Sequence, residues 1–408
     1  MKYFLIGLII CFSLFSEDIS LQEKESTIAA LEKRLKPFLK LRWDKLLATH
    51  KKGLLAAETK KSFYRAITKM LNATKQSHTA ITPPYLQNSS GGKAGYGLTV
   101  KLVEGTACIT AVKKGSMAEK AGIKPGYIIQ KINSFHVETY LKKLLRTNLK
   151  PHKKRSSLYY FFQNTLSQKE GAELKFVFKN RDDKIENISL RAVLPKGKAV
   201  KLGHLSESYL SFEKRKLTAS TGYIAFNLFY VQHMKPIKKA FYDFHYLENI
   251  IIDLRGNPGG IGILAGTIAT LFMGKKSNLG TSDMPEFKLT IPVWQNEHAF
   301  KGRVYVIIDE SSGSTSEMFA GSLQELGRVS VIGRQSMGSV LTSYIVKLPD
   351  GSRLQYPVGD YKTPGGKSLE GIGVIPNDVL KLKRRDFIKH DDPILARCLE
   401  IIKKGKVK

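Results

Sequence analysis

Hydrophobic residues near the start of the chain follow a helical period. Within residues 20–75, the stretches TIAALEKRLKPFLKL and ETKKSFYRAITKMLNAT carry apolar residues at positions i, i+3, i+4 and i+7, which predicts amphipathic helices. The pair Pro83-Pro84 and the stretch NSSGGKAG follow them and predict a linker. We therefore expect a helical N-terminal segment over residues 17–85.

From Gly95 onward, apolar and polar residues alternate as is typical of strands. After two short strands, we expect a short helix at Ser116–Ala121 and a further strand at Tyr127–Ile132. The stretches AELKFVFKN and ENISLRAVL predict two more strands, and a basic helical insertion over roughly residues 140–168 precedes them. The pattern predicts a small β domain over residues 93–195.

Between residues 217 and 380, apolar strands alternate with helical stretches. The strand candidates are TGYIAFNLF, NIIIDLR, RVYVIID and VSVIG, and the helices are expected up to His245, from Ile261 and from Ser314. Such alternation predicts an α/β domain with a largely parallel sheet. We expect this core to occupy residues 210–385.

The end of the chain carries two further patterns. TSYIVKLP and RLQYPVG, separated by a turn with the sequence Pro-Asp-Gly, predict a hairpin. A helical pattern at Pro393–Lys403 follows. We expect residues 386–408 to form a C-terminal helix and a basic tail.

The first residues have the pattern of a targeting signal. Lys2 precedes an apolar run from Tyr3 to Phe15, and polar residues begin at Ser16. This run is too short to span a membrane and has the length of a signal-peptide core. We therefore expect residues 1–16 to be a signal peptide and the protein to be exported, either periplasmic or secreted. An uncleaved membrane anchor is the alternative.

Composition narrows the classes of partner. The chain has 66 Lys and Arg against 35 Asp and Glu, a formal charge of +31, which would attract acidic partners. The basic residues are scattered and are not interleaved with aromatics, so we expect no nucleic-acid partner. No cluster of His, Cys, Asp and Glu has metal-ligand spacing, so we expect no metal or other cofactor. Cys108 and Cys398 lie in apolar stretches that favour buried thiols over a disulfide. The sequence leaves open whether the chain forms a homo-oligomer.

The β domain resembles a known peptide-binding module. Its loop GYGL, the later stretch VKKGSMAEKAGIKPGYIIQKIN and their order resemble a PDZ domain. The resemblance implies that an extended peptide adds as a strand to a sheet edge. Its C-terminal carboxylate would then meet the loop formed by Gly95, Tyr96, Gly97 and Leu98. An unrelated small β domain is the alternative.

Three stretches of the α/β core carry candidate chemistry. They are IIDLRGNPGG, SGSTSE and TPGGKSLEGIGVIPND, in this order. Taken alone, the glycines fit an ordinary strand–helix turn, and Ser314 with Glu317 fits a capping box. Together, the stretches resemble the C-terminal processing and tricorn-type serine peptidases. The resemblance implies an α/β core of the ClpP/crotonase-like type.

That resemblance assigns the nucleophile and the oxyanion hole. Ser314 would be the nucleophile, and the N–H groups of Gly259, Gly260 and Thr315 would bind the oxyanion. The processing branch of the family uses a lysine at the position that Ser339 occupies here. The Ser–Lys dyad is therefore absent, and the nearby Arg334 cannot replace it because a guanidinium keeps its proton.

The base is expected in the stretch KQSHTAI, which resembles the Ser-His segment of the tricorn branch. His78 would be the general base, since an imidazole is largely unprotonated near neutral pH. Glu370 would orient it, and Ser77 would support them by hydrogen bonding, with a bridge between the two as one arrangement. On local grounds alone, His78 also fits an ordinary linker histidine and Glu370 a solvated loop acid.

The function implied is that of an exported serine endopeptidase, acting through an acyl-enzyme on Ser314. The PDZ domain would recruit the substrate or gate the site. The alternative is a catalytically inactive family member that acts as a PDZ-based binding or scaffold protein. His233 and His245 are expected at the surface.

Overall fold

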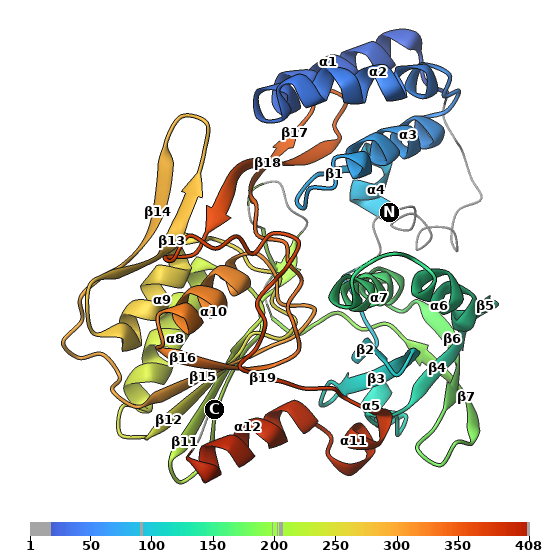
Figure 1. Cartoon of the computed structure of the whole chain (residues 1–408). Helices are drawn as coiled ribbons and strands as arrows, with labels where there is room; N and C mark the ends of the chain where they lie inside the picture. The colour runs from blue at the N-terminus through green and yellow to red at the C-terminus, as the bar shows by residue number, and fades with distance from the viewer. Residues whose placement is uncertain (1–17, 90–92, 198, 202, 204–206, 406–408) are drawn as a thin grey trace.

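The computed structural model describes residues 18–405 apart from 90–92, 198, 202 and 204–206. The expected signal peptide, residues 1–16, lies outside the described residues. Within the described part of the chain, no helix combines the length and apolar character that a membrane crossing needs. The chain forms a helical N-terminal segment, a β domain and an α/β core (Figure 1).

The N-terminal segment is helical, as its periodicity predicts. Its helices are α1 (Leu21–Leu39), α2 (Leu41–Leu55) and α3 (Lys60–Ala73), followed by β1 (Ala80–Thr82) and α4 (Pro84–Ser89). Ser20 caps α1 in a capping box with Glu23, which satisfies N–H groups that the first turn leaves open. The predicted linker is wrong at its start, because the short helix α4 begins at Pro84.

The β domain is an antiparallel sheet with helices on one face. Its order is β2-β3-β4-β6-β7, with β5 beside β4. Apolar side chains of α6 and α7 share one core with the sheet, including Leu144, Leu158 and Phe162. The basic insertion therefore forms these two helices. The elements are β2 (Leu98–Val103), β3 (Thr106–Val112), α5 (Met117–Lys120), β4 (Ile128–Ile132), β5 (Phe135–His136), α6 (Val137–Leu145), α7 (Pro151–Thr165), β6 (Glu173–Lys179) and β7 (Ile185–Arg191).

The α/β core is built on a largely parallel sheet, as the alternation predicts. Its order is β10-β11-β12-β15-β16-β19, and only the β10–β11 pairing is antiparallel. One apolar cluster includes side chains of α8, α9 and α10, and another lies under α12. The strands are β10 (Phe212–Thr218), β11 (Thr221–Phe226), β12 (Asn249–Asp253), β15 (Arg303–Ile308), β16 (Val329–Gly333) and β19 (Asp378–Val379). The helices are α8 (Val231–Asp243), α9 (Ile263–Met273), α10 (Thr315–Glu325), α11 (Arg384–Lys389) and α12 (Pro393–Lys404).

A second sheet joins the core to the N-terminal helices. Its order is β1-β18-β13-β14, with β17 beside β18. The predicted hairpin is β17 (Thr342–Lys347) and β18 (Arg353–Lys362), and its residues Leu348, Leu354 and Tyr356 pack against the helices. The pair β13 (Ser277–Asp283) and β14 (Lys288–Val293) was not expected from the sequence. The short pair β8 (Ala199–Val200) and β9 (Ser208–Tyr209) lies on the connection into the core.

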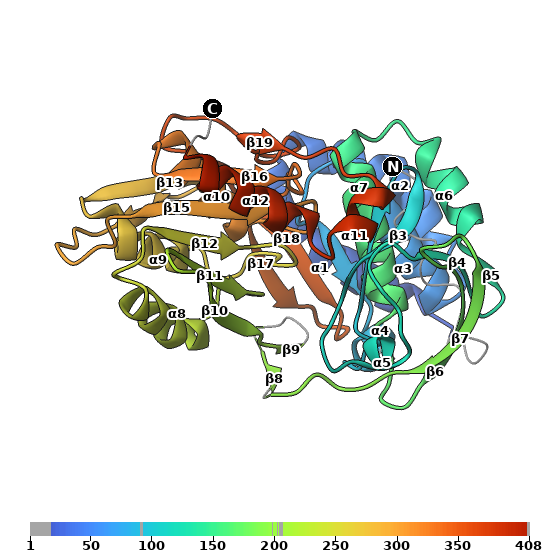
Figure 2. The same cartoon turned by 90° about the horizontal axis from the view of Figure 1, so that it is seen from below.

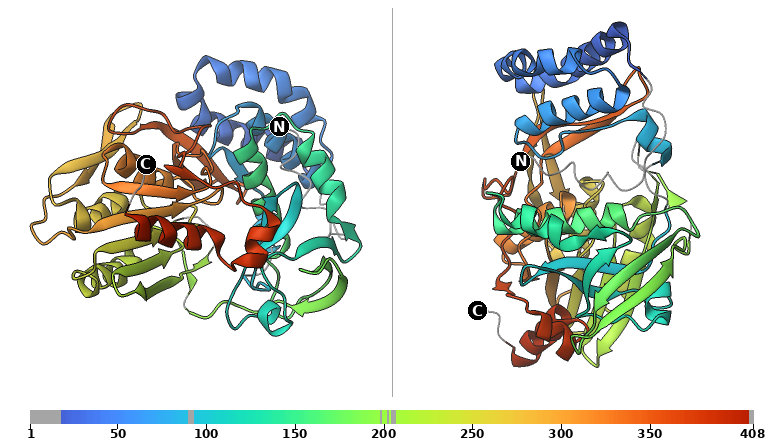
Figure 3. Two further views of the ribbon diagram at one scale, coloured as in Figure 1. Left: turned by 60° about the horizontal axis from the view of Figure 1, so that its bottom comes forward. Right: turned by 90° about the vertical axis from the view of Figure 1, so that its right-hand side faces the viewer.

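Polar contacts hold the β domain against the core. Lys101 of β2 forms a buried ion pair with Asp309, just after β15. At another point, Arg384 of α11 donates to the main-chain oxygen of Gly126 at 2.8 Å. Figures 2 and 3 show α11 beside the β domain and α12 along the core. Ser156 of α7 donates to the Glu310 carbonyl at 2.8 Å, which places α7 next to the loop that follows β15.

Candidate active site

The serine-rich loop after β15 is almost completely buried, with one exception. Ser311 donates to the Asp309 carboxylate, Ser312 to the Leu254 carbonyl at 2.8 Å, and Ser316 to the Asn257 carbonyl at 2.9 Å. These three serines are at most 1% exposed. Ser314 is only partly buried. Solvent access and the hydrogen-bond roles of the other serines therefore single out Ser314 as the candidate nucleophile.

Ser314 has a strained backbone at the start of α10. Its φ is +51° and its ψ is −119°, a region that residues with a β-carbon rarely occupy and that clusters at functional sites. Its N–H donates both to the Ser339 carbonyl at 2.9 Å and to Glu317 Oε2 at 3.0 Å. The expected helix start at Ser314 is confirmed, and the Glu317 carboxylate takes the predicted capping position.

Glu317 fixes the loop next to Ser314, the candidate nucleophile. Its Oε1 accepts from Ser336 Oγ and from the Gly338 N–H, both at 2.6 Å. Its Oε2 accepts from the Ser339 N–H at 2.9 Å. Complete burial raises the pKa of this carboxyl, while these hydrogen bonds act in the opposite direction. The carboxylate therefore links the Ser314 backbone to residues 336–339.

The glycine-rich turn lies directly against Ser314. A β-carbon on Gly259, whose φ is +110°, would lie 2.7 Å from Ser314 Cβ and 2.8 Å from the Thr315 nitrogen, so the position requires glycine. The Gly259 N–H donates to Asn257 Oδ1 at 2.9 Å, which leaves the Gly260 and Thr315 N–H groups as the better oxyanion donors. Helix α9 begins at Ile263, so the glycines precede the helix instead of opening it.

The Ser-His segment meets Glu370 through Ser77. Ser77 Oγ donates to Glu370 Oε2 at 2.9 Å and lies 2.9 Å from His78 Nδ1. The Ser77 N–H also donates to Glu370 Oε1, at 3.0 Å. The two ends of this contact are 293 positions apart in the sequence. The expected group of Ser77, His78 and Glu370 is thus brought together, with Ser77 between the other two side chains.

Two consecutive residues connect this group to the nucleophile. The Ser339 carbonyl accepts from the Ser314 N–H, and the Val340 N–H donates to Glu370 Oε2 at 2.9 Å. Residues 339–340 therefore touch both halves of the candidate site. Burial lowers the pKa of His78, and Lys153 adds to that effect while Glu370 opposes it.

Lys153 is a residue of this site that sequence reasoning missed. It lies on α7 of the β domain, and its Nζ donates to the Gly338 carbonyl at 2.8 Å and lies 3.4 Å from Ser339 Oγ. Ser339 is the position at which the processing branch was expected to carry its lysine. In the sequence, Lys153 stands in the run KPHKKR, where nothing separates it from its neighbours.

The main-chain N–H groups of the GYGL loop differ in whether the domain itself engages them. The Gly95 N–H donates to the Val193 carbonyl at 3.0 Å, so it is engaged within the domain. Within the described part of the chain, no hydrogen bond engages the N–H groups of Tyr96 and Gly97. Leu98 begins β2. Tyr96 and Gly97 can therefore offer their N–H groups to a ligand, whereas Gly95 cannot.

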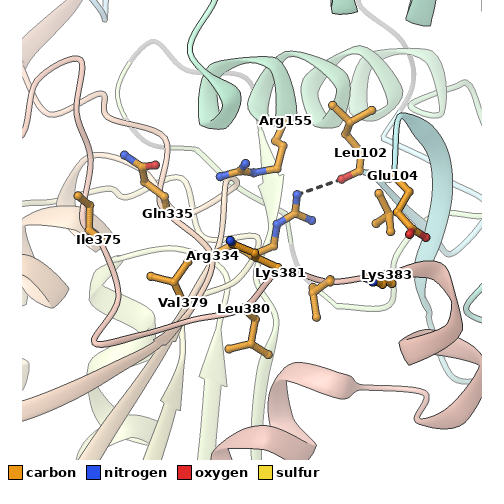
Figure 4. Close-up of a pocket in the computed structure, with 12 residues that line it drawn as sticks. Leu102, Glu104, Arg155, Arg334, Gln335, Ile375, Val379, Leu380, Lys381 and Lys383 are labelled. Atoms are coloured by element: carbon orange, nitrogen blue, oxygen red, sulfur yellow. Dashed lines mark hydrogen bonds between the residues drawn. The ribbon is translucent and has the colours of Figure 1, made fainter. Parts of the chain in front are cut away.

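A cavity of about 450 Å³ lies between the β domain and the core. Arg155 of α7 and Arg334 line it, and Arg334 donates to the Leu102 carbonyl at 2.9 Å (Figure 4). Both guanidinium groups also face the buried Glu310 carboxylate, Arg334 at 3.3 Å and Arg155 at 3.9 Å. None of the candidate catalytic residues lines this cavity, which therefore belongs to the domain interface.

The structure tests the expectations for the two cysteines and for His233 and His245. Cys108 and Cys398 are buried free thiols, as expected. The prediction for His233 is wrong, because it is 3% exposed and its Nδ1 lies 2.7 Å from the Leu228 carbonyl. His245 is exposed, as expected. Among the described residues, no group of His, Cys, Asp and Glu side chains is arranged to hold a metal ion.

Comparison with known proteins connects the core to a peptidase family. Residues 220–380 match the model of Peptidase family S41. A "Probable CtpA-like serine protease" of Staphylococcus epidermidis is 26% identical over 302 residues, which cover 72% of this chain and 55% of that protein. Its namesake in Staphylococcus aureus is also 26% identical over 302 residues, covering 72% of this chain and 54% of that protein. The chain spans about half the length of the curated relatives it matches.

Solved structures share the fold at low sequence identity. The photosystem II D1 C-terminal processing protease matches with a TM-score of 0.58 and 20% identity, covering 88% of this chain and 92% of that one. Mature CPAF complexed with lactacystin matches with a TM-score of 0.64 and 12% identity, covering 94% and 97%. The tricorn protease matches with a TM-score of 0.50 and 16% identity, covering 94% of this chain and 37% of that one. Residues 220–380 are therefore similar in sequence to Peptidase family S41, and most of the chain shares its fold with these solved structures.

Proposed function

We propose that this chain is a serine endopeptidase that cleaves protein or peptide substrates through an acyl-enzyme on Ser314. The observation that carries the proposal is the contact of Ser77 with both His78 and Glu370. Through this contact the imidazole of His78 is oriented, and the Glu370 carboxylate can stabilise its positive charge. A serine nucleophile needs a base that is held and stabilised in this way.

The hydrogen bonds indicate which imidazole nitrogen is the base. A serine hydroxyl has one proton, and Ser77 gives it to Glu370 Oε2. Ser77 Oγ then accepts from His78 Nδ1–H across the 2.9 Å contact, so the lone pair is on Nε2. In the proposed reaction, Nε2 takes the Ser314 hydroxyl proton as Oγ attacks the carbonyl, and later returns it to the leaving amine. Glu370 stabilises the imidazolium through Ser77.

The pH dependence follows from the environment of His78. Its pKa lies below the ordinary 6.5, mainly because of burial. The base is therefore unprotonated at neutral pH, and kcat/KM should rise with pH through a value below 6.5 and then level off. The pH at which this limb lies separates a histidine base from a lysine base, because a lysine side chain in water has a pKa of about 10.4.

The oxyanion hole is proposed to consist of the Gly260 and Thr315 N–H groups. Gly259 holds the turn against the nucleophile, and Thr315 Oγ1 donates to the Gly260 carbonyl at 2.9 Å. This bond keeps the two candidate donors side by side. Preorganised donors of this kind supply a large part of the rate in acyl transfer.

The remaining parts of the proposal concern the β domain and the cell compartment. The antiparallel sheet, the short helix α5 and the GYGL loop of the β domain support the proposal that it is a PDZ domain, which would recruit substrate or gate the site. The parallel sheet of the core supports the proposed ClpP/crotonase-like type. The apolar run after Lys2 supports export. The +31 charge is compatible with acidic partners.

Three substitutions test the catalytic assignment against a matched control. Ser314→Ala should lower turnover by about four to six orders of magnitude and abolish labelling by a fluorophosphonate. His78→Gln should cost nearly as much, because members of one catalytic unit are not additive. Glu370→Gln should cost about 10² to 10⁴. The exposed His245→Gln should cleave casein at the parent rate.

Two outcomes would contradict the proposal. A parent protein that takes up no fluorophosphonate and cleaves no casein would favour the inactive, PDZ-based scaffold. A His78→Gln variant that keeps most of the parent activity would show that another group is the base. Circular dichroism on each variant separates loss of catalysis from loss of folding.

A further inference from the structure

A lysine of the β domain, Lys153, reaches the candidate active site of the core. We propose that Lys153, on α7 of the β domain, is a positioning residue that fixes residues 338–339 and places a positive charge beside the Ser314–His78–Glu370 machinery. The inference rests on the proposed function. It makes the catalytic site a product of two domains.

Geometry gives Lys153 a structural role at the centre of the site. Its Nζ donates to the Gly338 carbonyl at 2.8 Å, and the Gly371 N–H donates to the same oxygen at 3.0 Å. The Gly338 and Ser339 N–H groups bind Glu317. Lys153 therefore fastens, from the β-domain side, the segment whose other hydrogen bonds hold the Ser314 backbone.

The charges around Lys153 explain why a cation is tolerated there. Burial is the largest effect and lowers the pKa of Lys153, with a further contribution from Lys150, while Glu317 of α10 and Glu370 oppose the shift by favouring the charged form. Around His78, the charged groups are Glu370 and Lys153. Lys153 thus offsets part of the Glu370 field at His78, and keeps the imidazole unprotonated at a lower pH.

The hydrogen bonds also argue against Lys153 as the base. A base must lie within hydrogen-bond reach of the serine hydroxyl, whereas Nζ donates to the Gly338 carbonyl. Its second neighbour is Ser339 Oγ, at 3.4 Å. Within the described part of the chain, no hydrogen bond joins Lys153 to Ser314.

Four variants of the full chain separate the two roles of Lys153, with kcat/KM measured as a function of pH. Lys153→Met removes both the donor and the charge. We expect kcat/KM to fall on the order of 10²-fold, the usual cost of a small misplacement of catalytic groups. We also expect the acid limb to move to higher pH, because the cation that lowers the His78 pKa is gone. Lys153→Gln keeps a donor without charge, and should show the same shift with a smaller loss of rate.

The other two variants are controls. Lys153→Arg keeps the cation, so its acid limb should stay at the parent pH. Lys150→Met removes a lysine three residues earlier on the same side of the domain interface, whose Nζ lies 3.3 Å from the Gly371 carbonyl. It should leave the acid limb unchanged, since Lys150 does not act on His78.

The outcomes keep the inference distinct from the proposed function. Parent-like profiles for Lys153→Met and Lys153→Gln, with an inactive His78→Gln, would overturn the inference alone. If Lys153→Met and Lys153→Arg were both as inactive as Ser314→Ala while His78→Gln stayed active, a Ser–Lys dyad would replace both proposals. If Lys153→Met does not fold, the Lys153→Gln and Lys153→Arg profiles decide the question.

Discussion

Replacing Glu317 by glutamine tests whether one buried carboxylate organises the nucleophile loop. Its two oxygens accept four hydrogen bonds, from Ser336 Oγ and from the N–H groups of Ser314, Gly338 and Ser339. All four partners are donors. A glutamine has nearly the same shape but keeps only one oxygen, and its NH₂ group is itself a donor.

The geometry sets the size of the effect. If the NH₂ group takes the Oε1 position, Ser336 can turn its hydroxyl to accept, but the Gly338 N–H loses its partner. If it takes the Oε2 position, the Ser314 N–H keeps the Ser339 carbonyl, but the Ser339 N–H loses its partner. Either orientation leaves one main-chain N–H unsatisfied, which costs about 1–3 kcal/mol. The retained bonds also lose their charge assistance, so we expect a loss of about 2–3 kcal/mol in the free energy of unfolding.

Urea denaturation followed by circular dichroism measures this loss. The control is Glu286→Gln, which changes an exposed carboxyl in the same way and should stay within about 0.5 kcal/mol of the parent. We also expect lower peptidase activity for Glu317→Gln, because the Ser314 backbone loses a constraint. Equal stability of Glu317→Gln and Glu286→Gln would refute the reasoning, since the four hydrogen bonds would then contribute nothing net.

Two further predictions concern the strained serine and the GYGL loop. Ser314→Gly should be about 1 kcal/mol more stable than Ser314→Ala, because glycine accepts a φ of +51° without strain; urea denaturation of both variants measures this, and an alanine variant of equal stability would contradict it. The full-length Ser314→Ala protein should bind a peptide with a free C-terminal carboxylate at least about 10-fold more tightly than its amidated form, because charge-assisted hydrogen bonds are lost on amidation. Gly97→Ala should remove this preference, since its β-carbon would lie 2.2 Å from Ser116 Cβ. Equal affinities for the two peptides in fluorescence polarisation would exclude carboxylate capture.

Local patterns account for most of the secondary structure. Helical periodicity gave α1 and α3, and strand–helix alternation gave the parallel sheet, because both reflect which side chains each element buries. The hairpin of β13 and β14 was not predicted because its first strand, SNLGTSD, has little alternation and contains a glycine with a positive φ. The linker prediction at Pro83-Pro84 was wrong because proline is also tolerated in the first turn of a helix, and α4 begins at Pro84.

The candidate site was predictable only where a family resemblance supplied the long-range contact. Nothing local in KQSHTAI indicates that Ser77 meets Glu370. The contact of Lys153 with the site was not predicted because it depends entirely on how α7 packs beside residues 338–339. His233 was misplaced because a ring that packs against Phe226 and Phe212 is not distinguishable from a surface histidine by its sequence neighbours.

The long sequence separation between Ser77 and Glu370 has a consequence for the life of the polypeptide. The ribosome makes the chain from the N-terminus, so His78 emerges long before Glu370, 293 positions after Ser77. Until that part of the chain is made and folded, the imidazole of His78 lacks the carboxylate that the proposed mechanism assigns to it, and proteolysis by that mechanism would be slow. A fragment that stops before residue 370 would carry Ser314 and His78 without the carboxylate of Glu370. If the proposed mechanism holds, the order of synthesis therefore delays full proteolytic activity until the fold is nearly complete.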